Sequence, residues 1–208
     1  EFVKQCRSEF PEIEEFWLIA RREEKIKENI KEVTGVKFKI VPLDLARDES
    51  YKELSALLAG EKPDVRLLIN NAGLGFWGAV SELPVHRQIN SVDVNVKAVS
   101  AVTAVCLQYM SVGARIVFVS SIASFVPNAY MTVYSATKAY VNSYARALRY
   151  ELKKQRISVT VVCPGPMDTE FIERGGVRSE TFRKLPYCNV EKVVRGTLKA
   201  AKKKKFIY

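Results

Sequence analysis

The chain has 208 residues, of which 48% are apolar and 27% are charged. These proportions lie near the averages for folded proteins and exclude disordered, collagen-like and coiled-coil chains, while the length suits one domain with a substantial core. Lys and Arg number 33 against 23 Asp and Glu, so the net charge of +10 suits an anionic cofactor and permits weak contact with nucleic acid or anionic membranes.

Several classes of protein are disfavoured by particular residues. No apolar run reaches the roughly 18 residues of a transmembrane helix, and the first residues form neither a charged leader nor an apolar signal core. The cysteines (Cys6, Cys106, Cys163 and Cys188) are scattered without C-x-x-C spacing, which predicts reduced thiols and a cytoplasmic location. The single histidine, His86, argues against a metal site.

Short apolar runs alternate with longer amphipathic stretches. In chain order the pattern predicts a helix at 2–10, a strand at 16–20, a helix at 22–33, a strand at 37–44, a helix at 49–59, a strand at 65–69, a mostly helical segment at 85–109, a strand at 114–121, a helix at 134–153, a strand at 157–163, a helix at 190–201 and a strand at 205–208. The strands are continuous Val, Ile, Leu and Phe runs, which is typical of strands buried on both faces of a parallel sheet. The alternation predicts an α/β fold, with a doubly wound Rossmann-type sheet flanked by helices on both faces.

The order of elements is unusual at both ends. A doubly wound domain normally opens with a strand and a glycine-rich turn, whereas the first predicted element is the helix at 2–10. The last predicted strand stops at Tyr208. We therefore expect residues 1–208 to be one domain that lacks the first strand and the glycine-rich turn of this fold.

Two residues at the start of one predicted helix carry the sharpest chemical signal. Tyr134 and Lys138, four residues apart, share one helix face. A phenol with a pKa of about 10 exchanges protons poorly at neutral pH, and a nearby ammonium lowers that pKa. Most such pairs are surface pairs without function. Ser121, however, lies at the end of the strand 114–121, where doubly wound sheets bind ligands, although a serine there also commonly caps a turn. The three residues predict a general acid/base site.

Further motifs extend this pattern along the chain. They are Asp44-Leu45, Asn70-Asn71-Ala72-Gly73 after the strand 65–69, Asn95, and Pro164-Gly165-Pro166-Met167-Asp168-Thr169 after the strand 157–163. Singly, N-N-A-G and P-G are ordinary turn sequences. Together with Ser121 and Tyr134-x-x-x-Lys138, in this order and spacing over essentially the whole chain, they resemble the short-chain dehydrogenase/reductase family.

The resemblance implies a role for each catalytic residue. Tyr134 would protonate a carbonyl oxygen, or deprotonate an alcohol in the reverse direction. Lys138 would lower the pKa of Tyr134 and bind the nicotinamide ribose. Ser121 would orient the substrate oxygen, and Asn95 would hold a water that links Lys138 to solvent. The residues that would contact the cofactor are Arg21, Arg22, Asp44, Leu45, Asn71, Ala72, Gly73, Tyr134, Lys138, Pro164, Gly165, Met167 and Thr169.

The end of the strand predicted at 16–20, which would be the second strand of the sheet if the missing one is counted, bears on the choice of cofactor. Ala20 stands where NAD-preferring relatives carry an acid, and Arg21 stands where NADP-preferring relatives carry a cation. A planar guanidinium pairs well with a phosphate dianion. Alternatively, Arg21 and Arg22 merely begin a charged helix. We predict NADP(H), although the family's T-G-x-x-x-G-x-G loop for the pyrophosphate is not present in the sequence.

The substrate is less determined than the reaction. Residues 170–189 correspond to a mobile substrate lid in the family, and their apolar and basic residues suggest an apolar pocket with a cationic rim. The combined prediction is a cytoplasmic NADP(H)-dependent oxidoreductase for a small-molecule carbonyl or alcohol, forming homodimers or homotetramers, with no nucleic-acid or membrane partner. The alternative is a non-catalytic dinucleotide-binding regulatory protein; the intact Ser/Tyr/Lys/Asn set argues against it, and the missing glycine loop argues for it.

Overall fold

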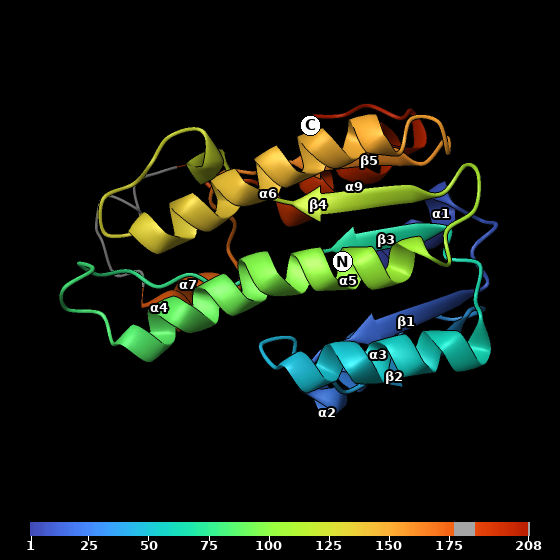
Figure 1. Cartoon of the computed structure of the whole chain (residues 1–208), viewed down its shortest axis with the longest axis horizontal. Coiled ribbons are helices and arrows are strands. Elements are labelled where there is room, and N and C mark those ends of the chain that lie inside the picture. The colour runs from blue at the N-terminus through green and yellow to red at the C-terminus, as the bar shows by residue number, and fades with distance from the viewer. Residues whose placement is uncertain (177–185, 208) are drawn as a thin grey trace.

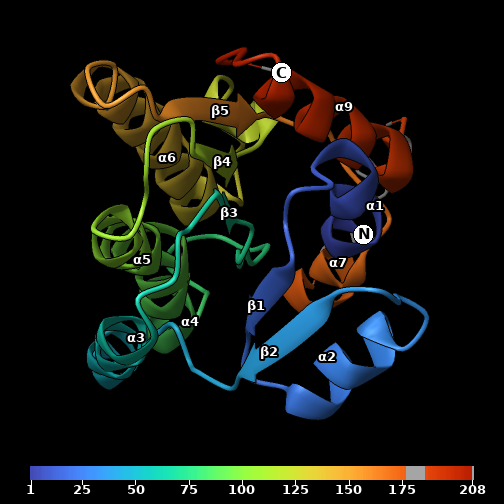
Figure 2. The same cartoon turned by 90° about the vertical axis from the view of Figure 1, so that its right-hand side faces the viewer.

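The computed structural model describes residues 1–176 and 186–207. Its strands are β1 (Glu15–Ile19), β2 (Lys37–Val41), β3 (Leu67–Asn70), β4 (Arg115–Val119) and β5 (Ser158–Val162). Its helices are α1 (Phe2–Glu9), α2 (Glu23–Ile30), α3 (Asp48–Glu61), α4 (Val85–Val92), α5 (Ala98–Leu107), α6 (Thr132–Glu151), α7 (Glu170–Gly175) and α9 (Val190–Lys202). All strand pairs are parallel, and helices cover both faces (Figures 1 and 2), so the predicted α/β class is confirmed.

The strands form two sheets rather than the single sheet that the sequence predicts. β1 pairs with β2, and β3, β4 and β5 follow one another in a second sheet. The arrows of β1, β3 and β4 point the same way in Figure 1, and the edges of β1 and β3 face each other without hydrogen bonds between these strands. One further parallel strand between β1 and β3 would join the two sheets, so the discontinuity lies at the centre of the expected fold.

Three apolar clusters hold the layers together. The first packs β4 and β5 against α5 and α6 through fully buried residues that include Ile116, Phe118 and Val159. The second lies on the opposite face, where Val117 meets α1 and α9. The third joins β2 to α3 and α5. Figure 2 shows α3, α5 and α6 on one face of the sheets and α1, α2 and α9 on the other. The burial of alternate strand residues on both faces explains why the strands are apolar throughout.

The segment predicted as mostly helical at 85–109 is divided into three helical parts. α4 passes into a π-helical turn, Asp93–Lys97, and then into α5. A π-helical turn widens the backbone locally, and Asn95 within it is fully buried. The prediction of a mostly helical segment is therefore confirmed, although the sequence did not indicate the π-helical turn at the position of a predicted site residue.

The last predicted strand, at 205–208, is wrong as a strand. Only one isolated parallel bridge, between Val161 and Ile207, is found among the described residues, and Tyr208 lies outside them. Lys204 adopts a left-handed conformation with φ of 56°, and the Lys205 N–H donates to the carbonyl of Ala200. This turn keeps the chain at the end of α9 until Phe206, so little of it remains to pair with β5.

Other boundaries shift by a few residues. β2 ends at Val41 instead of residue 44, because the Leu43 N–H donates to the carbonyl of Val41 and turns the chain. α6 begins at Thr132, two residues before the prediction, which places Tyr134 in its first turn. In the predicted lid, Glu170–Gly175 forms the short helix α7, which the sequence did not predict, and residues 177–185 lie outside the described part.

Candidate active site

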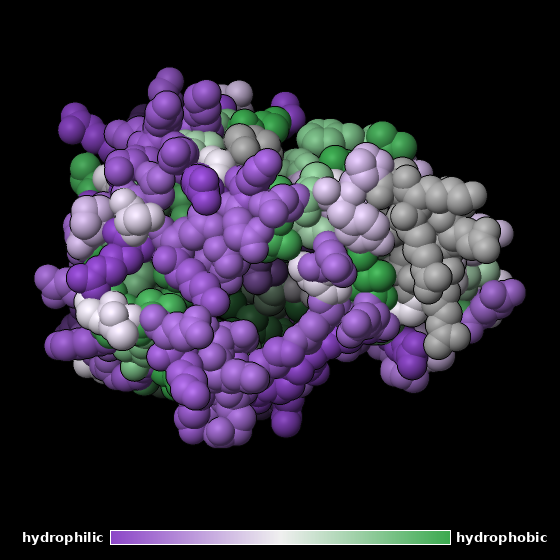
Figure 3. Space-filling view, turned by 180° about the vertical axis from the view of Figure 1, so that it is seen from behind, coloured by the Kyte–Doolittle hydropathy of each residue, from purple (hydrophilic) through white to green (hydrophobic). Residues whose placement is uncertain are grey.

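A large groove opens at the carboxyl ends of the strands. It has a volume of about 1510 Å³ and runs along the gap between β1 and β3, as far as residues that precede these strands, such as Ile13 and Val65. Figure 3 shows a hollow near the centre of the rear face, with apolar residues inside a hydrophilic rim. The predicted site residues that line the groove are Leu45, Asn71, Ala72, Gly73, Ser121, Tyr134, Lys138, Pro164, Gly165, Met167 and Thr169. Arg21, Arg22, Asp44 and Asn95 are not among its lining residues.

Tyr134 is half-buried and enclosed by apolar neighbours. The ring of Phe171 on α7 lies 5.2 Å from the Tyr134 ring, centroid to centroid. Gly75 approaches so closely that a Cβ there would lie 2.7 Å from Phe171 and 2.8 Å from Tyr134. Burial raises the pKa of Tyr134 above its ordinary value, and a hydrogen bond with Ser121 opposes this shift. The phenol is therefore protonated at neutral pH and able to donate a proton.

Ser121 has both of the roles that the sequence left open, because it caps a turn and also lies in the candidate site. It follows β4 and is 9% exposed. Its hydroxyl accepts a hydrogen bond of 3.2 Å from the Ala123 N–H and so caps the 3₁₀ turn Ile122–Ser124. The same side chain is hydrogen bonded to Tyr134. Its capping role fixes the hydroxyl at the end of the strand, beside the phenol.

Lys138 differs from its expected role in one respect. Its Nζ donates a 2.8 Å hydrogen bond to the Val119 carbonyl and lies 5.7 Å from the centre of the Tyr134 ring. Burial lowers the pKa of Lys138 from 10.5 to about 8, and Cys163 opposes this shift. Lys138 is not among the causes that shift the pKa of Tyr134. The expected lowering of that pKa is not found in this structure, because desolvation acts against the charged form of both groups.

Asn95 acts as a clamp on the loop after β3. Its Oδ1 accepts from the Leu74 N–H at 2.8 Å, and its Nδ2 donates to the Leu74 carbonyl at 2.7 Å and to Thr137 Oγ1 at 2.9 Å. Both N–H groups of the amide are thus used, so its Oδ1 keeps the only remaining capacity for a water. The clamp brings Gly73 so near that a Cβ there would lie 3.3 Å from Lys138 Nζ.

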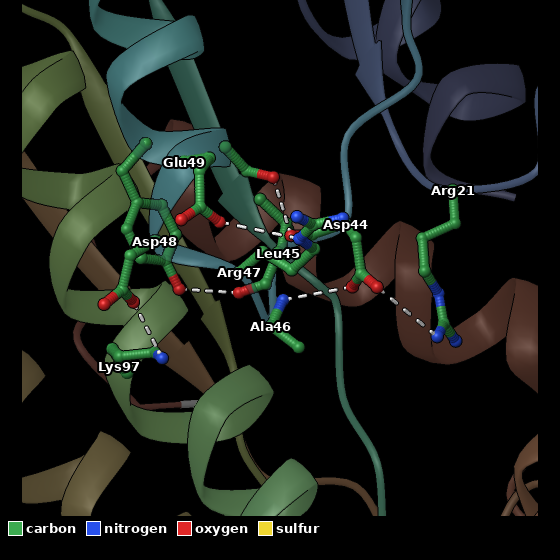
Figure 4. Close-up of polar contacts among 10 residues, drawn as sticks. Arg21, Asp44, Leu45, Ala46, Arg47, Asp48, Glu49 and Lys97 are labelled. Atoms are coloured by element: carbon green, nitrogen blue, oxygen red, sulfur yellow. Dashed lines mark hydrogen bonds and ion pairs between the residues drawn. The ribbon is translucent and has the colours of Figure 1, made fainter.

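The predicted adenosine end is a cluster of turn residues after β1 and β2 (Figure 4). Asp44 Oδ1 accepts from the Ala46 N–H at 3.1 Å, and Asp44 Oδ2 lies 4.0 Å from Arg21 Nη1. The Tyr51 hydroxyl donates to the Leu45 carbonyl at 2.6 Å and supports the same turn. Arg21 and Asp44 are thus neighbours, as a shared adenosine site requires.

Arg22 points away from this cluster. It precedes α2, and its Nη2 lies 3.2 Å from Glu170 Oε2 at the start of α7. Lys25 of α2 and Arg174 of α7 are also paired with Glu170. The structure therefore divides the two arginines, which the sequence had treated alike, between different acidic partners.

Some site residues were missed by the sequence analysis. Thr137 holds Asn95, and its hydroxyl donates to the Tyr134 carbonyl at 2.8 Å; a hydroxyl within Y-S-A-T-K was the available signal. Gly75, which contacts both rings, lies just beyond the N-N-A-G motif. Lys25 and Glu170 had no signal, because their pairing spans 145 positions of sequence. Among the described residues, no group of three or more His, Cys, Asp or Glu could hold a metal ion.

The residues present fit a nicotinamide dinucleotide at both of its ends. At the nicotinamide end, Gly73 has no side chain that would crowd the ammonium group of Lys138. At the other end, Arg21 supplies a cation beside Asp44, while Arg22 is paired with Glu170. The groove has Gly73 and Lys138 on its wall at the first end and Leu45 at the second.

Comparison with known sequences places these motifs in a family context. A family model described as "short chain dehydrogenase" matches residues 13–176, which is most of the chain. An uncharacterized oxidoreductase of Staphylococcus aureus is 28% identical over 154 residues, covering 73% of this chain and 67% of the relative. A probable short-chain type dehydrogenase/reductase of Helicobacter pylori is 30% identical over 133 residues, covering 63% of this chain and 49% of the relative.

Solved structures show the same architecture. A short-chain dehydrogenase from Sphingobium yanoikuyae in complex with NADPH is 25% identical, with a TM-score of 0.80 over 93% of this chain and 76% of that chain. A bulky-bulky ketone specific alcohol dehydrogenase from Comamonas testosteroni is 26% identical, with a TM-score of 0.76 over 93% of this chain and 74% of that chain. A short-chain dehydrogenase/reductase from Serratia marcescens, 23% identical, has a TM-score of 0.81 over 96% of this chain and 84% of that chain, and it supports the fold.

Proposed function

Since this chain belongs to the short-chain dehydrogenase family, we propose that it transfers a hydride between NADP(H) and a small-molecule carbonyl/alcohol pair, with Tyr134 as general acid/base. The observation that carries the proposal is the convergence of Tyr134, Ser121 and Lys138 on one groove at the carboxyl ends of the strands. This is where parallel α/β sheets bind ligands. The oxidoreductase relatives agree with the class of reaction.

Tyr134 supplies the proton to a carbonyl oxygen in the proposed reduction. Its raised pKa keeps the phenol protonated at neutral pH, which favours proton donation over proton abstraction. The Ser121 hydroxyl, fixed by the Ala123 N–H, donates a second hydrogen bond to the same substrate oxygen. The dinucleotide, when bound, supplies the hydride.

Lys138 and Asn95 support this step in different ways. Lys138, bonded to the Val119 carbonyl at the floor of the groove, stands where it binds the ribose hydroxyls of the nicotinamide half. Asn95 holds the loop of Gly73 and Leu74 in place, and only its Oδ1 remains able to accept from a water. We therefore assign Asn95 mainly to positioning this loop. Its Oδ1 has one lone pair left, with which it can also bind the water of a proton relay.

The preference for NADP(H) rests on the cations after β1. Ala20 offers no carboxylate to a ribose 2′-hydroxyl, and Arg21 and Arg22 follow it. The NADPH complex of the Sphingobium relative supports this choice. Asn71, Ala72, Pro164, Gly165, Met167 and Thr169 line the groove beside the nicotinamide half and complete the proposed cofactor site.

The proposed substrate lies beside Tyr134, Phe171 and Gly75. These apolar contacts suit a carbonyl with a hydrophobic substituent, and the named preference of the Comamonas relative for ketones agrees with this class. Assembly into homodimers or homotetramers and a cytoplasmic location stay predictions. None of the helices in the described ranges is long and apolar enough to cross a membrane.

A second function is kept because of one observation. β1 and β3, on either side of the groove, are not hydrogen bonded to each other, so a dinucleotide-binding protein without catalysis is the alternative. The test is the oxidation of NADPH by the purified chain across a panel of aldehydes and ketones, with binding of NADPH measured in parallel. Turnover of any carbonyl supports the enzyme; binding without turnover supports the alternative.

A further inference from the structure

Three cations surround one carboxylate between α2 and α7. Glu170 Oε2 lies 3.2 Å from Arg22 Nη2 and 2.5 Å from Arg174 Nη2, while Glu170 Oε1 is paired with Lys25 Nζ. Each of the four side chains is between one third and just over half exposed. Two of the cations come from the segment after β1, and the other cation and the carboxylate come from the segment after β5. The cluster therefore links the two sheets across the groove.

The charges of this cluster do not balance. One carboxylate faces three cations, and the acidic residues nearest on α2, Glu23 and Glu24, are already paired with Lys27. Within residues 1–176 and 186–207, no second carboxylate is paired with Arg22, Lys25 or Arg174. A phosphate monoester, with two negative charges and three acceptor oxygens, would satisfy these donors better than a carboxylate does.

The position of the cluster identifies which phosphate suits it. Arg22 lies three residues beyond the end of β1, the place where a dinucleotide-binding sheet contacts the adenosine ribose. Arg21, which the sequence favoured for the 2′-phosphate, is turned instead toward Asp44 at 4.0 Å. Among the cations after β1, Arg22 and Lys25 are thus the two that face a carboxylate, Glu170, which a phosphate could replace.

We propose that Arg22 and Lys25 form the 2′-phosphate subsite and that Glu170 occupies it until the phosphate displaces it. The proposal rests on the proposed NADP(H) function and names the residues that determine its specificity. Lys25 adds a contact that only a 2′-phosphate can use. Glu170 competes with that phosphate, so it weakens NADP(H) binding while leaving the binding of a cofactor with a free 2′-hydroxyl unchanged.

The test measures nucleotide binding by calorimetry, and needs no turnover. The ligands are 2′,5′-ADP, 5′-AMP, which lacks only the 2′-phosphate, and 5′-ADP, which carries a pyrophosphate instead. The variants are Glu170→Gln and Lys25→Ala. Their controls are Glu173→Gln on the same helix as Glu170, and Lys27→Ala on the same helix as Lys25. Unfolding midpoints of all variants establish that they are folded.

Because exposed ion pairs are individually weak, we expect Glu170→Gln to tighten 2′,5′-ADP binding by about three- to tenfold, and Lys25→Ala to weaken it by a similar factor. Binding of 5′-AMP and 5′-ADP should stay within about twofold for both variants, and the controls should match the wild-type chain within the same margin.

Three results would overturn the inference. Glu170→Gln could leave 2′,5′-ADP binding unchanged, Lys25→Ala could leave it unchanged, or either variant could alter 5′-ADP binding equally, which would assign the cluster to the pyrophosphate. Failure of the proposed function is distinct from these results. In that case the wild-type chain would bind 2′,5′-ADP no better than 5′-AMP, or would consume no NADPH with any carbonyl.

Discussion

The two sheets of this protein are built in different ways. β4 and β5 are buried along most of their length, and Ile116, Val117 and Phe118 are fully inaccessible. In β1 and β2 only Val41 is buried, and the remaining residues are half-buried or exposed. The residues proposed for proton transfer stand on the buried sheet and α6, whereas the cations proposed for cofactor choice stand on loops and helices after β1.

This division separates reaction chemistry from cofactor choice. Ser121, Lys138 and Asn95 are held by backbone partners and are buried, so close packing resists small displacements. Arg21, Arg22 and Lys25 make exposed ion pairs, whose partners can exchange at low cost. We therefore expect substitutions in the first region to affect stability and turnover, and substitutions in the second to affect the choice between NADPH and NADH.

The largest expected difference concerns stability. Ile116→Ala in β4 removes a fully buried side chain, so it should lower the free energy of unfolding by about 2–5 kcal/mol. The same change at half-buried Ile19 in β1 should cost only about 1 kcal/mol, because less surface is lost from the core. Urea denaturation of both variants measures the difference. Equal losses would mean that the two sheets are equally well packed.

Tyr134→Phe tests the chemistry of the buried region. The variant keeps the ring that contacts Phe171 and removes the proton donor, so turnover should fall by at least about 10²-fold, equivalent to roughly 2.7 kcal/mol, while NADPH binding persists. Steady-state rates and calorimetric binding give the two readouts. Turnover near the wild-type value would remove Tyr134 from the mechanism.

Arg21→Asp tests the exposed region. The new carboxylate would repel a 2′-phosphate and accept a hydrogen bond from a 2′-hydroxyl, beside Asp44. The ratio of kcat/KM with NADPH to that with NADH should drop by at least about tenfold, or roughly 1.4 kcal/mol. Arg47→Asp, at another exposed arginine near Asp44, is a control for the added charge. A ratio that stays constant in Arg21→Asp would assign the preference to other residues.

Lys138 gives the smallest effect and a defined pH window. Its pKa is lowered from 10.5 to about 8 in the folded chain, so between these values the unfolded chain binds the proton that the folded chain has lost. The contribution of Lys138 to stability therefore rises with pH through this window. Relative to Lys138→Met, the wild-type chain should gain about 1 kcal/mol in unfolding free energy between pH 7 and pH 9. A constant difference would mean that Lys138 titrates as it does in water.

How far the sequence predicts the molecule depends on the range of the interactions. Apolar runs set the strands and amphipathic periods set the helices, so the fold class and the order of elements followed from local pattern. The split between β1 and β3 did not, because strand adjacency is a property of the whole sheet. The strand predicted at 205–208 is wrong for a local reason, because the chain makes a left-handed turn at Lys204 and only Ile207 bridges to β5. The Lys-rich sequence before it does not indicate such a turn.

The candidate site shows the same limit. Ser121, Tyr134 and Lys138 were predicted because they lie within motifs at short spacing, and the structure brings them to one groove. The sequence did not show that the pKa of Tyr134 is raised, because the burial of Tyr134 depends on Phe171 and Gly75, which come from distant segments. The separate partners of Arg21 and Arg22 were likewise invisible, since Glu170 lies 148 positions from Arg22.

One measurement tests most directly the claim that chemistry and cofactor choice reside in separate regions. It is kcat/KM for one reducible carbonyl with NADPH and with NADH, in the wild-type chain, Tyr134→Phe and Arg22→Ala. We predict that Tyr134→Phe lowers both values by the same factor, so that their ratio is unchanged, and that Arg22→Ala lowers only the NADPH value. Near-normal rates in Tyr134→Phe, or an equal loss with both cofactors in Arg22→Ala, would contradict the account.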